Sequence, residues 1–481
     1  MKKDIINNIV DNFMLISKIA RPSHHEEKIS NWLVNWAKDQ GLNPVQDSVN
    51  NVMFDVPATL GMEDKPLGIL QGHMDMVVAV ADGKEFDKLN DPIQVIRNDK
   101  EGTLSADGTS LGGDDGIGIA IIMAVAQDEM AHGPLRMIIT VDEEDGMTGA
   151  MNVSPSWFDG ASFLINIDNE WSNQVIVSTA AGDSINFEKN VSFVDASRDM
   201  SFAIELSNLK GGHSGVEINK GRLNAIRGLA TLLKQIENDG VNYELSLFEG
   251  GTASNAIPAK ATTTIVIYAE DQTKLEKRVN TYLNEIIEKY KGIEENIKCT
   301  VTKVEHNLKV ISNEEKNNLI RYVTEVYDGV YTMSQDMKDL VESSSNLGLV
   351  KLNQDGISVA GLIRSSSPEK EIELVNLEKN LAKECGYEVI PKKSTDAWKF
   401  DPNSELLEIA KEVYKAQNNE DIEVAAIHAG LECGTFKKIK SDLDMISIGP
   451  DLKDGHTINE TLYIRSIPKI WYLLEGILTK V

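Results

Sequence analysis

Several short apolar runs in this sequence end in histidine or carboxylate side chains. The runs are PLGILQGHMD, LRMIITVDEE, ASFLINID and LDMISIGPDLKDGH, and the polar residues that close them are His73, Asp75, Glu143, Glu144, Asp168 and His456. Continuous apolar runs that alternate with helical stretches are typical of a mostly parallel sheet with helices on both faces. Because the carboxyl ends of such strands meet at one edge of the sheet, we expect these side chains to converge there.

A fifth segment, SLGGDDGIG, places Asp114 and Asp115 in a glycine-rich turn that opens a predicted helix. One polar residue at the end of a strand is ordinary, since strands leave the core there. Four such strand ends together with an aspartate pair are more than a solvated surface requires. The pattern therefore predicts a functional site.

The charge balance argues against two classes of protein. The chain has 481 residues, with 48 Lys and Arg against 75 Asp and Glu, a formal net charge of −27. So negative a surface repels phosphate backbones and anionic lipid, so we expect neither a nucleic-acid nor a membrane partner. Three distant cysteines without a CxxC pair indicate a reducing compartment. With no secretory pattern at the N-terminus and no apolar run longer than 117–126, we expect a cytoplasmic protein.

The pattern of the chain changes near residue 186. Residues 1–186 predict the first segment of an α/β catalytic domain with a mostly parallel sheet. Residues 187–391 predict an inserted α+β domain of two related units, the second of which begins with the strand-like KCTVTKVEH at 298–306. Residues 392–481 return to the first pattern and carry His456, so we expect one discontinuous domain interrupted by the insert.

The N-terminal segment contains two helix signals. Apolar spacing predicts a helix over 5–20, and Ser23 with Glu26 has the spacing of a capping box for a second helix. Four further histidines stand in polar or helical contexts and are expected at the surface: His24, His25, His132 and His306.

The residues at the strand ends share a chemistry. Two histidines and several carboxylates, without cysteine, suit Zn²⁺, Co²⁺ or Mn²⁺. A two-metal centre needs one bridging carboxylate, plus a histidine and a carboxylate for each ion, which leaves one Asp and one Glu over. Asp75 lies on the same side of its strand as His73 and can accept the ring N–H. Of Glu143 and Glu144, one can bind metal while the other moves a proton, which predicts metal-assisted hydrolysis of an amide or ester.

At this point the sequence resembles the co-catalytic zinc exopeptidase family, which includes carboxypeptidase G, aminoacylase and peptidase T. Within the family it is most similar to the dipeptidases that cleave aminoacyl-histidine. The resemblance covers nearly the whole chain and is carried by motifs in the same order: SKIARPSHHEE, LQGHMDMV, DGTSLGGDDGIGIA, VDEEDGMTGA, INIDNE, LKGGHSG, GGTASNAIP, GLIRSSS, IHAGLECG and IGPDLKDGHT.

The resemblance implies a role for each residue of the site. It places His73 and Asp168 on one metal ion and Glu144 and His456 on the other, with Asp114 as the bridge. Asp75 becomes the carboxylate behind His73, and Glu143 the general base. The dipeptidase pattern usually has Asn where this chain has Asp115, whereas the peptidase T branch has Asp there. Asp114 is therefore kept as the bridge, and Asp115 is the second choice. The family also implies a cis peptide bond between Asp114 and Asp115.

The insert corresponds to the lid domain of this family. The resemblance implies that His213 in GGHSG stabilises the oxyanion and that Asn255 in SNAIP makes a second polar contact. It also implies that Arg364 binds the C-terminal carboxylate of the substrate. For His428 and Glu432 of IHAGLECG, a place in the substrate pocket and a structural role are equally supported.

The sequence therefore predicts a metal-dependent dipeptidase with two ions, Zn²⁺ before Co²⁺ or Mn²⁺. Its substrates would be dipeptides with free termini, Xaa-His among them. An aminoacylase or a tripeptidase is the alternative within the family. A catalytically dead peptide-binding relative is the alternative from another class, and the presence of Glu143 argues against it, because a binding protein needs no base. The resemblance favours a homodimer and leaves open whether His213 serves its own site or a partner's.

Overall fold

The computed structural model describes residues 5–128, 130–306, 308–335 and 337–481, which form two compact units. The first unit comprises Met1–Thr179, Trp398–Ala426 and Leu431–Val481, and the second comprises Ala180–Ala397 and Ile427–Gly430. The boundary predicted after residue 186 would cut through a strand, β9, that spans Ala181–Lys189. Among the described residues, no helix combines the length and the apolar character needed to cross a lipid bilayer.

The first unit is built on an eight-stranded mixed sheet. Its order is β1-β2-β6-β3-β7-β23-β8-β22, in which β6, β3, β7 and β23 are parallel neighbours and the pairs β1–β2, β2–β6 and β23–β8 are antiparallel. The strands are β1 Val45–Gln46, β2 Val52–Val56, β3 Leu67–His73, β6 Leu135–Thr140, β7 Ala161–Asn166, β8 Gln174–Thr179, β22 Glu423–Ile427 and β23 Asp444–Ser447. A smaller sheet contains β4 Val95–Asn98, β5 Thr103–Ala106, β24 Leu452–Lys453 and β25 Thr461–Tyr463.

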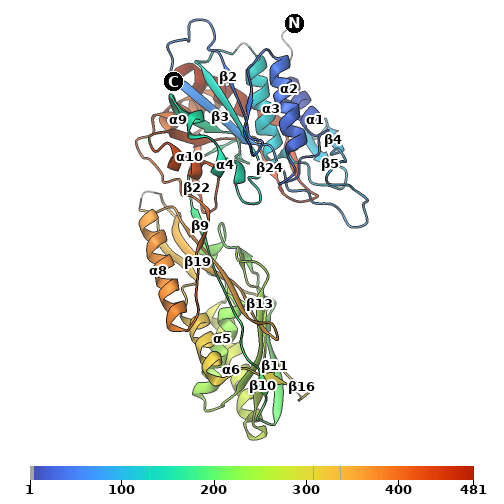
Figure 1. The fold of residues 1–481 in the computed structure, drawn as a ribbon, viewed down its shortest axis with the longest axis vertical. Helices are drawn as coiled ribbons and strands as arrows, with labels where there is room; N and C mark the ends of the chain where they lie inside the picture. The colour runs from blue at the N-terminus through green and yellow to red at the C-terminus, as the bar shows by residue number, and fades with distance from the viewer. Residues whose placement is uncertain (1–4, 129, 307, 336) are drawn as a thin grey trace. The chain divides into compact units, whose positions relative to one another are not determined.

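Helices cover both faces of the large sheet, as the apolar strands predict. Figure 1 shows α1, α2 and α3 on one side of the sheet and α9 and α10 on the other. The helices of this unit are α1 Ile5–Ile16, α2 Glu27–Asp39, α3 Gly113–Gln127, α4 Thr148–Asn152, α9 Glu405–Asn418, α10 Cys433–Ile439 and α11 Ile467–Lys480, with short 3-10 turns η1 Pro155–Phe158 and η4 Ile464–Ser466. Helix α3 is buried along most of its length, since it packs between α1 and β3.

The second unit is built on a nine-stranded antiparallel sheet. Its order is β16-β11-β15-β13-β19-β20-β9-β21, and β18 pairs with β19. The strands are β9, β11 Met200–Ser207, β13 Glu244–Gly251, β15 Ala261–Ile267, β16 Lys298–Val304, β18 Gly329–Met333, β19 Val341–Asn353, β20 Gly356–Ser365 and β21 Lys392–Thr395. Two-stranded ribbons join β10 Val194–Asp195 to β17 Lys309–Val310 and β12 Gly212–His213 to β14 Ala256–Ile257.

The helices of the second unit bury apolar side chains in a core shared with its sheet. Leu229 and Leu233 of α5, Val279 of α6 and Phe202 of β11 belong to this core. The helices are α5 Ala225–Asn238, α6 Gln272–Lys289, α7 Asn313–Glu325 and α8 Pro368–Glu384, with 3-10 turns η2 Ile218–Lys220 and η3 Ala269–Asp271.

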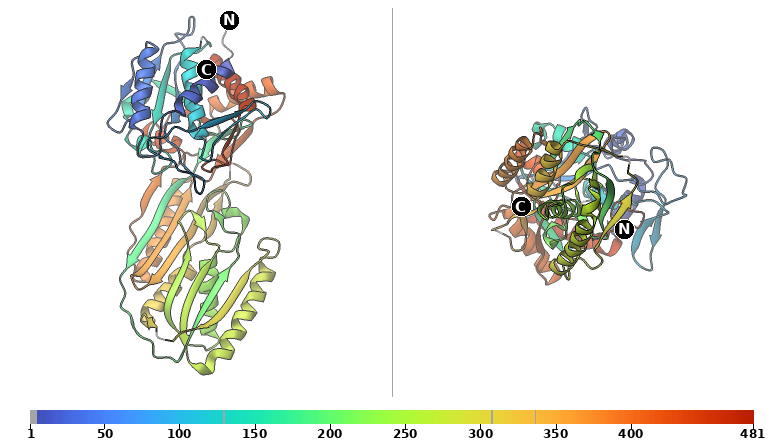
Figure 2. Two further views of the ribbon diagram at one scale, coloured as in Figure 1. Left: turned by 90° about the vertical axis from the view of Figure 1, so that its right-hand side faces the viewer. Right: turned by 90° about the horizontal axis from the view of Figure 1, so that it is seen from below.

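The sheet of the second unit has two halves with the same element order. One half is β11-α5-β13-β15-α6-β16. The other is β9-α7-β19-β20-α8-β21 with the additional strand β18 between α7 and β19, and the halves are joined where β13 pairs with β19. In Figures 1 and 2 the green strand β9 runs beside the orange strand β20, and β19 lies on the other side of β20. The segment 298–306 was expected to open the second of the two related parts of the insert. It contains β16, which instead closes the first half of the sheet. Element order alone could not reveal this, because both halves use a strand in that place.

The capping box predicted for the second helix, with Ser23 and Glu26, does not form. Helix α2 starts after Glu26, which makes no side-chain cap bond. The Ser23 hydroxyl instead donates to Asp75 Oδ2 at 2.8 Å, and Glu26 Oε1 accepts from the backbone N–H groups of His24 and Asp142. Tertiary contacts have therefore taken both side chains that the local pattern assigned to the helix end.

Candidate metal centre and substrate-binding residues

Polar side chains of the first unit converge at one edge of its large sheet. His73 is the last residue of β3, Glu143 and Glu144 follow β6, Asp168 follows β7, and His456 lies beyond β23. These four strands are adjacent and parallel, so their carboxyl ends lie side by side. The topology thus brings together residues that are far apart in the sequence.

Asp114 lies between the two imidazole rings. Its Oδ1 is 3.0 Å from His73 Nε2, and its Oδ2 is 2.9 Å from His456 Nε2. A second carboxylate stands beside each ring: Asp168 Oδ1 is 3.6 Å from His73 Nε2, and Glu144 Oε1 is 2.8 Å from His456 Nε2. Two ligands of one tetrahedral ion, each about 2 Å from it, lie roughly 3.3 Å apart. Two triplets of donor atoms, sharing Asp114, therefore have the spacing of ligands.

Asp75 joins the histidine to the turn that carries the two glutamates. Its Oδ1 lies 3.2 Å from His73 Nδ1 and accepts the N–H of Glu143 at 3.0 Å, and its Oδ2 accepts the N–H of Glu144 at 3.3 Å. The buried Asp75 carboxylate therefore fixes the orientation of His73 and the start of the Glu143–Glu144 turn at once.

The charge of this cluster is unbalanced. Burial raises the pKa of Glu143 and Asp168 well above the usual range, and neighbouring carboxylates raise both further. Burial lowers the pKa of His73, but Asp168, Asp114 and Asp75 outweigh it and raise that pKa overall. Across the described part of the chain, these carboxylates form ion pairs with His73 and His456 but with no lysine or arginine. Oxygen and imidazole donors with an excess of negative charge fit divalent cations.

Asp115 occupies a different place from Asp114. It is buried, and its two oxygens accept the backbone N–H groups of His73 at 3.2 Å and Gly118 at 3.0 Å. Burial and the neighbouring Asp168 raise its pKa well above the usual range. The expected cis peptide between Asp114 and Asp115 is confirmed. Asp115 therefore supports the backbone of His73 and does not lie between the two rings.

Two buried residues that the sequence did not single out hold the glycine-rich turn. Arg21 donates to the backbone carbonyls of Met74, Asp75 and Gly112. Glu460 accepts the N–H groups of three consecutive residues at 2.7–3.0 Å: Leu111, Gly112 and Gly113. Gly112, two residues before Asp114, is thus held at both its carbonyl and its N–H.

The glycines of SLGGDDGIG make room for Arg21. A Cβ on Gly112, where φ is +68°, would lie 2.7 Å from Arg21 Nη2, and a Cβ on Gly116 would lie 2.5 Å from the same atom. Neither distance is tolerable for a real side chain. Arg21 therefore accounts for glycine at position 116 and, together with Met76, at position 112, whereas Gly113 and Gly118 are crowded by Leu452 and Asp115.

In the second unit, His213 and Asn255 lie on one small ribbon. His213 pairs with Ala256 across β12 and β14, and Ser214 donates its N–H to the carbonyl of Asn255 at 2.8 Å. His213 Nδ1 accepts the N–H of Gly215 at 3.2 Å, so the neutral ring carries its proton on Nε2. Burial and the nearby Arg364 lower the pKa of His213, which favours this neutral form.

Arg364 is a buried arginine without a counter-ion. It lies on β20 opposite Ser344, and burial lowers its pKa to about 10. Its Nε has no hydrogen-bond partner, and it forms no ion pair within the described ranges. A buried guanidinium in this state has the donors that a carboxylate would accept.

The residues that the sequence left open fall in different units. His428 belongs to the second unit, where its Nε2 lies 2.7 Å from the Ser344 hydroxyl and burial, with Arg364 nearby, lowers its pKa to about 3. Glu432 belongs to the first unit and accepts hydrogen bonds from Gln71 and Thr140. His428 therefore lies among the basic residues around Arg364.

One of the four histidines expected at the surface is buried. His132 packs into the first unit with its Nδ1 2.6 Å from the carbonyl of Gly133, so that prediction was wrong. His24 is exposed, as expected, but its ring lies 3.2 Å from Asp142 and 2.9 Å from Asp145, beside the turn that carries Glu143. Nothing in the local sequence pattern around His24 predicts that contact.

The chain is similar to known peptidases over nearly its whole length. The chain is 35% identical over 480 residues to the cytosol non-specific dipeptidase of Escherichia coli K12, covering 98% of this chain and 97% of that protein. Its structure matches the aminoacylhistidine dipeptidase of Vibrio alginolyticus with a TM-score of 0.90 and 31% identity, covering 100% of this chain and 98% of that one. A tripeptidase of Staphylococcus aureus, at 17% identity and a TM-score of 0.56, shares the fold.

The family model for the peptidases M20/M25/M40 matches residues 69–480, which include every residue discussed above for the metal centre except Arg21 and Ser23. A match over most of the chain, together with a relative of 35% identity along nearly its full length, is sufficient to assign the family. The chain belongs to the peptidase family M20/M25/M40.

Proposed function

We propose that this protein is a metal-dependent dipeptidase that hydrolyses dipeptides with free termini, Xaa-His among them. The observation that carries the proposal is the position of Asp114, whose two oxygens face two different imidazoles, each with a further carboxylate beside it. The names of the two similar dipeptidases from Escherichia coli and Vibrio alginolyticus support the substrate class.

The ligand sets follow from the donor triplets. His73, Asp168 and Asp114 Oδ1 would hold one divalent ion, and His456, Glu144 and Asp114 Oδ2 the other. We propose Zn²⁺, with Co²⁺ or Mn²⁺ as alternatives, because the donors are imidazole and carboxylate. When bound, the ions would supply a Lewis acid and lower the pKa of an attacking water.

The remaining residues of the first unit would orient ligands and move protons. Asp75 accepts the Nδ1 proton of His73, which leaves Nε2 free to bind metal. Glu143 has no assigned place in either ligand set, and burial raises the pKa of this carboxyl above its usual range, which makes it a stronger proton acceptor than an exposed glutamate. Glu143 would take a proton from the attacking water and pass it to the leaving amine nitrogen.

The second unit would recognise the substrate. His213 would donate its Nε2 proton to the oxygen of the peptide carbonyl as that oxygen becomes negative, and Asn255 would add a second polar contact. Arg364 would pair with the C-terminal carboxylate of the dipeptide, which would supply the counter-ion that the buried guanidinium lacks. Recognition of that carboxylate would restrict substrates to very short peptides.

The test is release of amino acids by the purified protein from a panel. The panel contains several Xaa-His dipeptides including β-alanyl-histidine, other dipeptides, a tripeptide and an N-acetyl amino acid, each before chelation, after it, and after return of Zn²⁺, Mn²⁺ or Co²⁺. Chelator-sensitive cleavage confined to dipeptides is expected. Release mainly from the N-acetyl compound or the tripeptide would instead identify an aminoacylase or a tripeptidase, and no release with any metal would indicate a dead peptide-binding relative.

Two properties of the whole protein complete the proposal. We propose a cytoplasmic location, supported by the acidic composition and by three unpaired cysteines, all of which are buried. We also propose a homodimer, which rests on the family resemblance. Light scattering after size-exclusion chromatography tests the second point, and a mass of about one chain at all concentrations would contradict it.

A further inference from the structure

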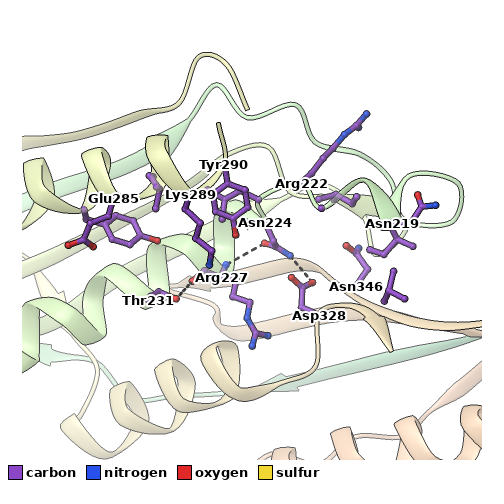
Figure 3. Close-up of a pocket in the computed structure, with 18 of the residues that line it drawn as sticks. Asn219, Arg222, Asn224, Arg227, Thr231, Glu285, Lys289, Tyr290, Asp328 and Asn346 are labelled. Carbon is purple, nitrogen blue, oxygen red and sulfur yellow. Dashed lines mark hydrogen bonds between the residues drawn. The ribbon is translucent and has the colours of Figure 1, made fainter. Parts of the chain in front are cut away.

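The second unit contains a cavity that has no part in the proposed catalytic machinery. Its volume is about 550 Å³, within the ~300–1,000 Å³ range of small-molecule sites. It is lined from η2, α5, α6, the 328–330 segment and β19, and all of its lining residues belong to the second unit. His213, Asn255 and Arg364 are not among them. Figure 3 shows its polar side chains.

Two of the three basic side chains that line this cavity, Arg227 and Lys289, form no ion pair among the described residues, whereas the third, Arg222, pairs with Glu217. Arg227 donates from Nη1 to the carbonyl of Val326. The acidic Glu285 also lines the cavity, and its Oε1 lies 3.6 Å from Arg278, a residue outside the lining. The lining therefore contains both signs of charge, the cations Arg227 and Lys289 and the carboxylates Glu285 and Asp328, and no ion pair joins them among the described residues. Such a lining suits a ligand that itself carries both charges.

Other walls of the cavity present unpartnered acceptors. Asn346 is buried, and its Oδ1 has no hydrogen-bond partner; the same holds for Gln235 Oε1. Asp328 accepts from Asn224 and from the N–H of Leu347 through Oδ1 alone, which leaves Oδ2 available. Figure 3 shows Lys289 on one side of Asn224 and Asp328 and Asn346 on the other. A ligand that satisfies all these groups carries a carboxylate at one end and N–H donors at the other.

We propose that this cavity binds a free α-amino acid as a zwitterion. Its carboxylate pairs with Arg227 and Lys289, and its ammonium donates to Asp328 Oδ2 and Asn346 Oδ1. Free amino acids are the products of the proposed reaction, so the identity of the ligand rests on the proposed function. The site itself is separate from the residues to which that reaction is assigned.

The walls of the cavity also support the ribbon that carries His213 and Asn255. Asn346 Nδ2 donates to the carbonyls of Ser254 and Ala256 at 2.7 and 3.0 Å, on either side of Asn255. Arg222 pairs with Glu217 at 2.6 Å, and Glu217 accepts the N–H of His213 at 2.9 Å. In Figure 3 Arg222 points away from the other labelled side chains, as these contacts require. An amino acid held by Asn346 would therefore change the support of the ribbon and alter kcat.

The first experiment measures binding without turnover. Equilibrium dialysis of labelled L-amino acids is run on the wild type, on Arg227→Met and Lys289→Met, and on Lys291→Met as a control for loss of an exposed lysine outside the lining. Arg364→Met is included because it removes the proposed carboxylate contact of the active site. Acetate and inorganic phosphate are the comparison ligands. Thermal melts check that each variant is folded, and Lys289→Met removes an exposed side chain that makes no hydrogen bond.

The expected result is one saturable amino-acid site per chain in the wild type, Lys291→Met and Arg364→Met. Binding should weaken at least tenfold in Arg227→Met and Lys289→Met, and acetate and phosphate should bind more weakly than the amino acid. Absence of saturable binding, or binding lost in Arg364→Met but kept in Lys289→Met, would overturn the proposal. Equal binding of acetate or phosphate would overturn the zwitterion. None of these outcomes depends on peptide hydrolysis, so they are separate from a failure of the proposed function.

A second measurement tests the coupling to the ribbon. At saturating dipeptide, which excludes competition in the active site, the bound amino acid should change kcat at least twofold in the wild type and in Lys291→Met. The change should be absent in Lys289→Met. Binding to the cavity with an unchanged kcat would overturn the coupling.

Discussion

The polar clusters of the two units have opposite imbalances of charge. In the first unit, Asp114, Glu143, Glu144 and Asp168 are gathered with two histidines, and none of the described lysines or arginines pairs with them. In the second unit, Arg364 is buried without a carboxylate, and the pKa values of His213 and His428 are lowered by burial and by that arginine. Burying unpaired charge costs free energy, so each cluster is suited to the charge that it lacks. The first suits metal cations, and the second suits the carboxylate of a substrate.

The two clusters also differ in the role that we propose for them: catalysis for the first and substrate recognition for the second. Residues of the first cluster have donors with the spacing of metal ligands and a spare carboxylate for proton transfer. Residues of the second cluster offer N–H donors from a neutral imidazole and a guanidinium. Mutations in the first cluster should therefore act on kcat and on metal content, whereas mutations in the second should depend on which groups the substrate carries.

The largest effect is expected for Glu143→Gln. The amide keeps the shape of the side chain but cannot accept the proton, so kcat should fall by roughly 10²–10⁴-fold. Metal content, measured by elemental analysis after dialysis, should stay near that of the wild type, because Glu143 lies outside both donor triplets. Asp145→Asn, at an exposed neighbouring position, is the control. Activity within tenfold of the wild type would remove Glu143 from the mechanism.

Arg364→Met should have the next largest effect. Loss of a charge-assisted hydrogen bond, about 1.5–3 kcal/mol, corresponds to roughly a 10–150-fold fall in kcat/KM for dipeptides. Dipeptide amides lack the C-terminal carboxylate, so for them the same substitution should change kcat/KM little. Arg364→Lys should recover part of the loss, since it restores charge without the planar pair of donors. An equal loss on dipeptides and their amides would show that Arg364 acts only on the fold.

The residues at the strand ends could be expected from the sequence because their signal is local. Each apolar run that ends in a polar residue predicts a strand end, and parallel order brings His73, Asp168 and His456 to one edge. The family resemblance then distinguished Asp114 from Asp115. The mixed strand directions at the edges of the sheet carry no such local signal, since apolar strands look alike in either direction.

The supporting residues could not be predicted because their partners are backbone atoms far away in the sequence. Arg21 binds the carbonyl of Gly112 and Glu460 binds the N–H groups around it, and neither contact leaves a pattern near the residue itself. A distant partner also explains why the predicted capping box at Ser23 was wrong: its hydroxyl donates to the side chain of Asp75. Local propensity cannot anticipate a tertiary partner that satisfies the same donor.

Glu460→Gln should weaken metal binding by about tenfold. The carboxylate accepts three N–H groups at the turn before Asp114, and residues that orient metal ligands typically contribute 10–100-fold to affinity. Competition with a chelator measures the change, and the d–d spectrum of the Co²⁺-loaded protein should shift if the bridging carboxylate has moved. Glu101→Gln, at an exposed turn, is the control. Unchanged affinity and spectrum would limit Glu460 to stabilising the fold.

The smallest effect concerns a buried carboxyl of the second unit, which avoids an uncompensated charge by keeping its proton. Glu378 on α8 accepts from the Ser345 hydroxyl at 2.5 Å, and burial raises its pKa to about 8. Because the folded state binds this proton more tightly than the unfolded state, the free energy of unfolding should fall as pH rises from about 4.5 to about 8, at up to roughly 1.4 kcal/mol per unit.

Glu378→Gln has no proton to lose and should lack this component of the slope. Denaturant unfolding from pH 5 to 8 should therefore show the variant gaining about 1–3 kcal/mol relative to the wild type as pH rises. Glu388→Gln, at an exposed position just beyond the same helix, should run parallel to the wild type. Parallel curves for Glu378→Gln as well would mean that Glu378 is ionised in the folded protein. The second unit would then bury negative charge without a cation, and the contrast between the two units would fail at that position.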